Sequence, residues 1–205
     1  MKIARRPRYL VSAAAILALL SSQATAETIV HKTVSYFQIG GTTAQDLDRE
    51  LERRGPYTMS TGARHPGATR IRFGGDVTYV ESGGRCRVGS AKVTLKTQLV
   101  LPKWKNRKRA GKDLALIWDA LSSDIRRHEE RHAEIARQYA RKLETSLKGL
   151  RPQRECLAME IKVAETTSRI IDAHDKDQMR FDRVEAANFE KRMIRILNYR
   201  SKRNP

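Results

Sequence analysis

Alternation of hydrophobic and polar positions marks the first part of the chain as rich in β-strands. β-branched and aromatic residues alternate along residues 28–39, and the run ends at Gly40-Gly41. Two further runs, residues 68–80 and 85–101, flank the turn sequence Ser82-Gly83-Gly84. One side of the last run would carry Val93, Leu95, Thr97, Leu99 and Leu101. Because a period of two places alternate side chains on one face, the pattern predicts a hairpin in a small antiparallel sheet with one buried face.

A short helix is expected between the first strand and the hairpin. Thr42 or Thr43 can cap its start, Leu47 and Leu51 make a narrow apolar face, and Gly55-Pro56 ends it.

From Lys112 onward the hydrophobic period is that of a helix. The apolar stripe consists of Leu114, Ile117, Trp118, Leu121, Ile125, Ile135, Tyr139, Leu143 and Leu147. Gly149 and Pro152 interrupt it. A second stripe follows, made of Leu157, Ile161, Ala164, Ile171, His174, Gln178, Phe181 and Glu185. Two long helical patterns joined by a short break predict an antiparallel helical hairpin, so the expected fold class is α+β.

The first 26 residues have the pattern of a secretory signal peptide. Four basic residues precede an apolar stretch at residues 10–20, and the small-residue site Ala24-Thr25-Ala26 follows. An apolar stretch of about eleven residues is too short to span a bilayer, although an uncleaved anchor remains an alternative. We therefore expect cleavage after Ala26 and a periplasmic or secreted protein without a membrane span.

The exported part is expected to form one α+β domain, residues 27–205. A strand-rich half would cover residues 27–110, the helical hairpin residues 111–198 and a basic tail residues 199–205. The two cysteines, Cys86 and Cys156, both lie in this part. Since an oxidising compartment favours pairing of an even number of thiols, we expect a disulfide between them.

The chain of 205 residues has a formal net charge of +18. Such a surface attracts anionic partners, including components of the cell envelope. Basic residues gather in the segments 103–109 and 200–203, but no motif of a nucleic-acid-binding module accompanies them. We expect a solvated basic face and no specific nucleic-acid partner.

The chemistry-bearing motif is His128-Glu129-Glu130-Arg131-His132, which reads HExxH. Residues four apart lie on one helix face, so His128 and His132 can offer two imidazole nitrogens to one zinc ion. Both are in phase with the apolar stripe and should point inward. Glu129 would then act as general base towards a water molecule at the ion. The alternative is a charged helical segment whose histidines recur by chance.

A catalytic zinc needs a third protein ligand. At 1.5 Å per residue the histidine pair lies roughly 28 Å before the break near Gly149, and a returning helix would cover that distance by about residue 171. His174 is therefore the expected third ligand, with a hydrogen-bonded packing histidine as its alternative reading. The other candidates are Glu165, Asp182 and Glu185, whereas His31 and His65 have no partner motif.

The order of these elements resembles a bacterial domain-of-unknown-function family described as predicted secreted zinc-dependent proteases. The resemblance rests on the HExxH helix and on these further matches: Tyr36 to Gly40, Thr43, Leu47, Gly55-Pro56, Cys86, the strand ending Leu101-Pro102-Lys103-Trp104, Cys156-Leu157 and Phe181-Asp182. It implies zincin-like activity with His128 and His132 as ligands and Glu129 as base.

The chain departs from that family after Phe181-Asp182. The family often continues into Thr-x-His-Gly, whereas this chain has no histidine or glycine in residues 183–188. If that histidine is functional in relatives, its role would have passed to Glu185 or His174.

Two functions from different classes are expected. The first is an exported zinc metallopeptidase acting on a peptide or protein substrate. The second is a non-catalytic basic envelope protein that binds anionic surface polymers or partner proteins on the same fold.

Overall fold

The computed structural model describes residues 28–59 and 61–203, so the predicted signal peptide lies outside the described residues. Within those ranges no helix combines the length and hydrophobicity that crossing a membrane requires. The strand-rich part precedes the helical hairpin, and the predicted α+β class is confirmed.

Three long strands form the main sheet, in the order β1 (Ile29–Ile39), β5 (Arg85–Trp104), β4 (Ala68–Ser82). β4 and β5 pair antiparallel as a hairpin, as the sequence predicts. β1 instead runs parallel to β5, so the sheet is mixed. Side chains alternate in the same way in parallel and antiparallel strands, so the hydrophobic pattern does not reveal in which direction β1 runs relative to β5. Between β1 and β4 the chain forms α1 (Ala44–Arg54) and the short strands β2 (Tyr57–Thr58) and β3 (Ala63–Arg64).

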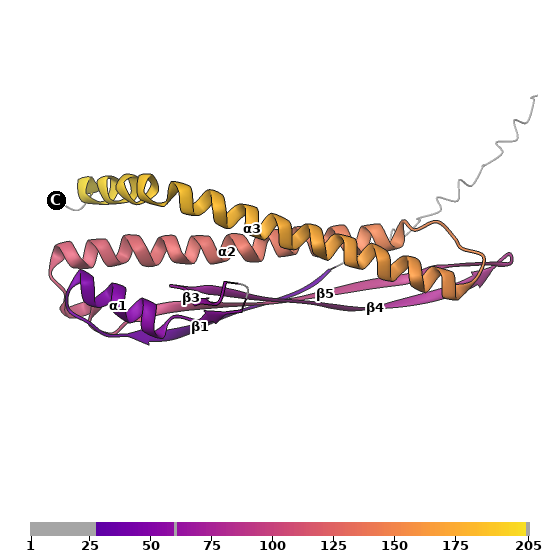
Figure 1. Ribbon diagram of the computed structural model, residues 1–205, viewed down its shortest axis with the longest axis horizontal. Coiled ribbons are helices and arrows are strands. Elements are labelled where there is room, and N and C mark those ends of the chain that lie inside the picture. Colours follow the sequence, from indigo (N-terminus) through magenta and orange to yellow (C-terminus); the bar gives the residue numbers. More distant parts are fainter. Residues whose placement is uncertain (1–27, 60, 204–205) are drawn as a thin grey trace, which may run out of the picture.

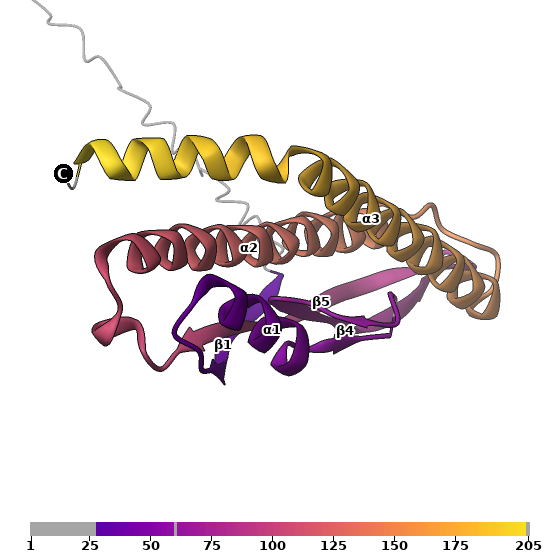
Figure 2. The ribbon, with the colours of Figure 1, turned by 60° about the vertical axis from the view of Figure 1, so that its left-hand side comes forward.

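Two long helices stack on one face of this sheet (Figure 1). A single 3-10 turn, η1 (Arg107–Arg109), leads from β5 into α2 (Lys112–Lys148), which lies directly on the sheet. α3 (Cys156–Arg203) is the outer layer and continues past the predicted boundary at residue 198. Figure 2 shows α3 crossing obliquely beside α2 in its first half and running above α2 in its second half.

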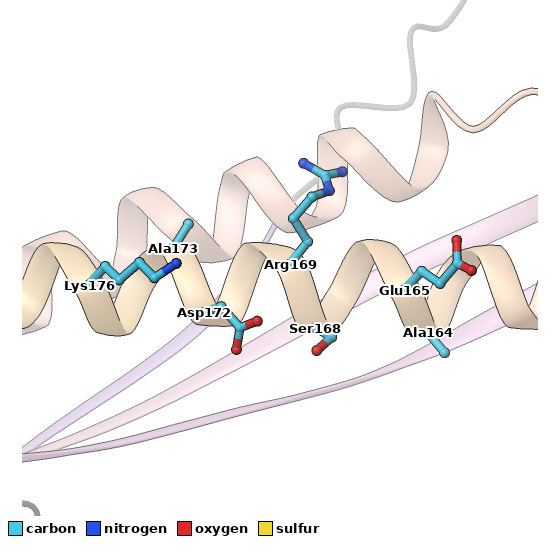
Figure 3. Close-up of a pocket in the computed structure, with 7 residues that line it drawn as sticks. All are labelled: Ala164, Glu165, Ser168, Arg169, Asp172, Ala173 and Lys176. Carbon is cyan, nitrogen blue, oxygen red and sulfur yellow. The ribbon is translucent and has the colours of Figure 1, made fainter.

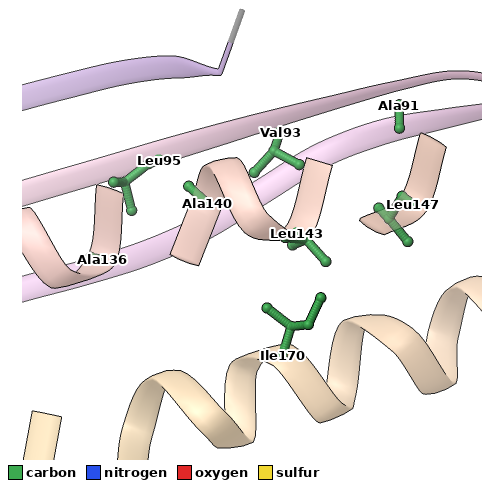
Figure 4. Close-up of a cluster of buried hydrophobic side chains, with 8 residues drawn as sticks. All are labelled: Ala91, Val93, Leu95, Ala136, Ala140, Leu143, Leu147 and Ile170. Atoms are coloured by element: carbon green, nitrogen blue, oxygen red, sulfur yellow. The ribbon is translucent and has the colours of Figure 1, made fainter. Parts of the chain in front are cut away.

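The main apolar core lies where β5, α2 and the first half of α3 meet (Figure 4). Val93 and Leu95 of β5 face Ala136 and Ala140 of α2, and these small residues let the helix approach the sheet closely. Ile170 of α3 points toward the α2 side of the cluster and is 1% exposed. Each large aliphatic side chain buried here contributes about 1.5–3 kcal/mol to stability.

The predicted apolar face of α3 is wrong in its first turns. Leu157 and Ile161 are 66% and 54% exposed, and in α2 Ile117 is also exposed. The buried positions in this part of α3 are Met159, Thr166, Ile170 and His174. These lie in phase with Cys156, whose attachment to the sheet sets the rotation of the helix.

That attachment is the predicted disulfide between Cys86 and Cys156, which is confirmed; the two Cα atoms are 5.0 Å apart. Backbone hydrogen bonds reinforce it, because the Cys86 N–H donates to the Gln153 carbonyl (2.9 Å) and the Gln153 N–H donates to the Cys86 carbonyl (2.8 Å). Both the turn before α3 and the first residue of α3 are therefore attached to β5 at Cys86.

Reduction of this disulfide should destabilise the protein by about 4 kcal/mol, because the bond closes a loop of 70 residues and so restricts the unfolded chain. Urea unfolding with and without reductant measures the difference. The double variant Cys86→Ser/Cys156→Ser should have the stability of the reduced protein, and reductant should not change it. Equal unfolding midpoints for the oxidised and reduced protein would contradict the expectation.

Candidate metal centre

His128 and His132 lie one turn apart on the face of α2 that meets α3. Their ring centroids are 4.7 Å apart, and the two Nε2 atoms approach to 3.0 Å. Their side chains are 27% and 14% exposed, so both imidazoles are largely withdrawn from water. Both imidazole rings point inward, as their phase with the apolar stripe predicts.

Asp182 of α3 completes the group. Its Oδ1 lies 3.0 Å from Nε2 of His132 and 3.4 Å from Nε2 of His128. One ligand atom from each of the three residues lies within 4.8 Å of the others. Tetrahedral zinc ligands at about 2.0–2.2 Å from the ion are roughly 3.3–3.6 Å from one another. One of the three separations lies in that range and two are slightly shorter, so the group could hold a small cation after a small outward movement of the side chains.

The surroundings shift the pKa values of Asp182 and His132 in opposite directions. Burial raises the pKa of Asp182, but hydrogen bonds from His128 and His132 outweigh it and hold that pKa well below its usual range. Burial lowers the pKa of His132, whereas its hydrogen bonds to Asp182 and Gln178 raise it above the ordinary value overall. An ionised carboxylate can ligate a metal ion directly, whereas the raised pKa of His132 means that an ion bound there would have to displace a proton.

Phe181 gives the pair an apolar wall. Its ring stacks on His128 with centroids 5.0 Å apart and meets His132 edge-on at 5.1 Å. The dipeptide Phe181-Asp182 therefore supplies both a packing surface and the carboxylate of the group.

Glu129 lies beside the pair but faces the sheet. It is 5% exposed, and Thr69 of β4 donates a hydrogen bond to its Oε2 at 2.8 Å. Burial is the main reason that the pKa of Glu129 is raised, although the Thr69 bond and the two histidines oppose the shift. Among the described residues no hydrogen bond is made to Oε1. One carboxylate oxygen is thus held by a hydrogen bond, and the other is not.

Gly67 makes room for this carboxylate. A Cβ at position 67 would lie 2.9 Å from Glu129 Oε1 and 2.8 Å from Cγ2 of Ile125. The start of β4 can therefore approach α2 only because residue 67 has no side chain.

The structure does not bring His174 into the group. His174 is 4% exposed, its Nδ1 lies 2.8 Å from Asp175 Oδ1, and its Nε2 lies 2.8 Å from Gln178 Nε2. The geometry favours the alternative reading of a hydrogen-bonded packing histidine. α3 meets the histidine pair later in its sequence than residue 174, because the turn lasts until Cys156 and because α3 crosses α2 obliquely.

The remaining candidates lie elsewhere or contribute indirectly. Glu165 pairs with Lys162 at 2.9 Å and lines a hollow on α3 formed by residues 164–176 (Figure 3). His31 is exposed on β1, and His65 Nε2 lies 2.6 Å from the Thr61 hydroxyl. None of these three belongs to the group around His128.

Gln178 and Glu185 lie behind the two histidines. Gln178 Oε1 is 2.6 Å from Nδ1 of His132, and Glu185 Oε2 is 3.7 Å from Nδ1 of His128. The sequence pattern assigns no role to Gln178 and offers Glu185 only as an alternative ligand. Together with Asp182 they occupy successive turns of α3, since they are spaced four and three residues apart. That spacing of polar residues inside a helical stripe is the signal that could have identified them.

A charge network holds the next turn of α3 against α2. Arg192 donates to both oxygens of Asp124, at 2.8 and 3.1 Å, and Arg127 donates to the same carboxylate at 3.0 Å. Both arginines also contact Glu185. Asp124 is 4% exposed; burial raises its pKa, but the hydrogen bonds from Arg192 and Arg127 lower it overall.

Comparison with known proteins gives a family match over most of the chain. Residues 34–189 match the family described as "Bacterial protein of unknown function (DUF922)". No curated protein and no solved structure matches the chain significantly. The family description assigns no activity, so a function must be argued from the chemistry of the site.

Gly67→Ala should destabilise the protein by about 2 kcal/mol, because the added methyl group overpacks the contact with Ile125 and Glu129. Gly74→Ala in the adjoining strand β4 is the matched control, since a methyl group at that position would have nothing within 4 Å. Urea unfolding of both variants measures the difference. Equal stability of the two would show that the close approach at Gly67 is not required.

Arg192→Met should cost about 2 kcal/mol at pH 7, because buried Asp124 loses two charge-assisted hydrogen bonds. The pKa of Asp124 is lower in the folded than in the unfolded chain, so this contribution is present above about pH 3.8 and is lost as the pH falls through the folded value. The difference between wild type and variant should therefore shrink below pH 3.8.

The control for this substitution is Arg195→Met, which replaces an exposed arginine on the same helix and should change stability by less than about 0.5 kcal/mol. Chemical unfolding between pH 3 and 7 provides the measurement. A pH-independent loss in Arg192→Met would assign the effect to packing and not to the ion pair.

Proposed function

We propose that this chain, which belongs to the bacterial family of unknown function that it matches, is an exported zinc-dependent metallopeptidase. The observation that supports the proposal is the convergence of His128, His132 and Asp182 within 4.8 Å, with the buried carboxylate of Glu129 next to it in the same helix. His174, the third ligand expected from the sequence, is replaced by Asp182 in this proposal.

In this proposal three side chains would hold an ion and a fourth would move a proton. His128, His132 and Asp182 would hold zinc, leaving a further position open. Zinc bound there would supply Lewis-acid polarisation of a peptide carbonyl and of a water molecule. Glu129 Oε1 would accept a proton from that water and pass it to the leaving amine, while Thr69 keeps Oε2 fixed. The raised pKa of Glu129 suits a group that both takes and returns a proton.

Strand β4 gives a peptide substrate a place to bind. In the sheet order β1-β5-β4, β4 is an edge strand, and its Thr69 contacts the proposed base. An extended peptide could pair with this edge through main-chain hydrogen bonds and bring a carbonyl close to Glu129.

A non-catalytic envelope protein is the second candidate. The observation in its favour is the net charge of +18, with exposed cations such as Lys103, Lys105 and Lys108 beside the start of α2. Such a protein would bind anionic surface polymers or partner proteins and would not depend on Glu129.

Glu129→Gln should abolish peptide hydrolysis while zinc stays bound, because the amide cannot accept the proton. His132→Ala should lose the ion, and Asp182→Ala should weaken its binding strongly. The measurements are zinc content of the purified protein, zinc affinity with a competing chelator, and cleavage of an unfolded protein substrate.

Glu130→Gln is the matched control, because it makes the same change in the same motif at an exposed residue and should leave turnover unaffected. Stoichiometric zinc with no hydrolysis in any preparation would favour the binding protein. Absence of bound zinc would refute the metallopeptidase.

A further inference from the structure

Gln178 occupies a position that defines which nitrogen of His132 carries a proton. Its side-chain amide lies between His132 and His174, all three being partly or fully buried. An amide has one accepting oxygen and one donating nitrogen, so its orientation decides the role of each ring nitrogen that it contacts.

Two contacts fix the orientation of this amide. Gln178 Nε2 lies 3.1 Å from the His132 carbonyl oxygen, which can only accept, so the amide nitrogen must be on that side. The same nitrogen lies 2.8 Å from Nε2 of His174. Nδ1 of His174 in turn donates to Asp175 Oδ1 at 2.8 Å, which leaves its Nε2 free to accept. The oxygen of Gln178 must therefore face His132.

The consequence for His132 is a defined tautomer. Its Nδ1 lies 2.6 Å from Gln178 Oε1 and must donate a hydrogen to it. In the charged ring Nε2 also carries a hydrogen and donates it to Asp182 Oδ1 at 3.0 Å. Once that proton has left, the ring is neutral and Nε2, which also faces His128, is the acceptor. A metal ion needs a lone pair at that atom.

We propose that Gln178 is a positioning residue that fixes His132 in its Nδ1–H tautomer and so presents the Nε2 lone pair to the metal centre, with His174 and Asp175 fixing the orientation of the Gln178 amide. Outer hydrogen bonds of this kind orient ligating histidines and strengthen metal binding. This also gives buried His174 a role that does not require contact with the ion. The inference rests on the proposed metal site and does not depend on peptidase activity.

The first measurement uses the metal-free protein and needs no ion. NMR of histidine ring nitrogens, at a pH where His132 is neutral, should show the proton on Nδ1 in the wild type. In Gln178→Met, which keeps the length of the side chain but removes the acceptor, the proton should move to Nε2. Gln178→Glu keeps an acceptor at this position and should restore the Nδ1–H form.

The second measurement is the dissociation constant for Zn²⁺ alone, determined with a competing chelator. Gln178→Met should weaken binding by about 10- to 100-fold, and Gln178→Glu should recover most of the loss. Gln138→Met makes the same substitution at an exposed position of α2 and should leave both the tautomer and the affinity unchanged. If Gln178→Met does not fold, His174→Leu removes the partner that orients the amide and should give mixed tautomers with a smaller loss of affinity.

The outcomes separate this inference from the proposed function. A wild-type His132 with its proton on Nε2, or a Gln178→Met protein with unchanged tautomer and affinity, overturns the positioning role. If the tautomers follow the expected pattern but neither the wild type nor any variant binds Zn²⁺, control of the tautomer by Gln178 stands, whereas its role in metal binding is overturned together with the metal centre.

Discussion

The rotation of α3 about its own axis is the constraint on which the candidate site depends. Asp182 reaches the histidine pair only because one face of α3 stays turned toward α2 as far as Arg192, while the start of the helix is fixed at Cys156. Burial of Ile170 keeps that face inward between the two ends. Since successive helix residues differ by about 100°, a shift of one residue would turn Asp182 away and expose the apolar residues of the core.

Much of the fold follows from local sequence. The alternation in residues 91–101 correctly predicts which side of β5 is buried, because strand geometry leaves no other choice for a sheet with one covered face. The inward direction of His128 and His132 follows in the same way from their phase with Ile125 and Ile135. The pairing of two cysteines follows from their number and from the expected compartment.

Other features depend on contacts between distant residues and were not predictable in this way. The phase of α3 at Leu157 is set by a bond to a residue 70 positions away. The choice of Asp182 over His174 depends on how obliquely two helices cross, which hydrophobic spacing does not encode. The roles of Gly67 and Thr69 arise only where the start of β4 meets Glu129, 60 residues after Thr69 in the sequence. Such contacts require the assembled fold.

The two halves of α3 are held by different forces, and this gives them different responses to the solvent. The first half is attached by a covalent bond and by apolar burial, neither of which is weakened by the screening of charge. The half that carries Glu185 and Arg192 is attached largely through charge pairs, and Arg127, which pairs with Glu185, is 42% exposed. Mobile counterions weaken exposed pairs within a Debye length of about 8 Å at physiological ionic strength. Rising ionic strength would therefore loosen α3 from its C-terminal end inward, toward the turn that carries Asp182.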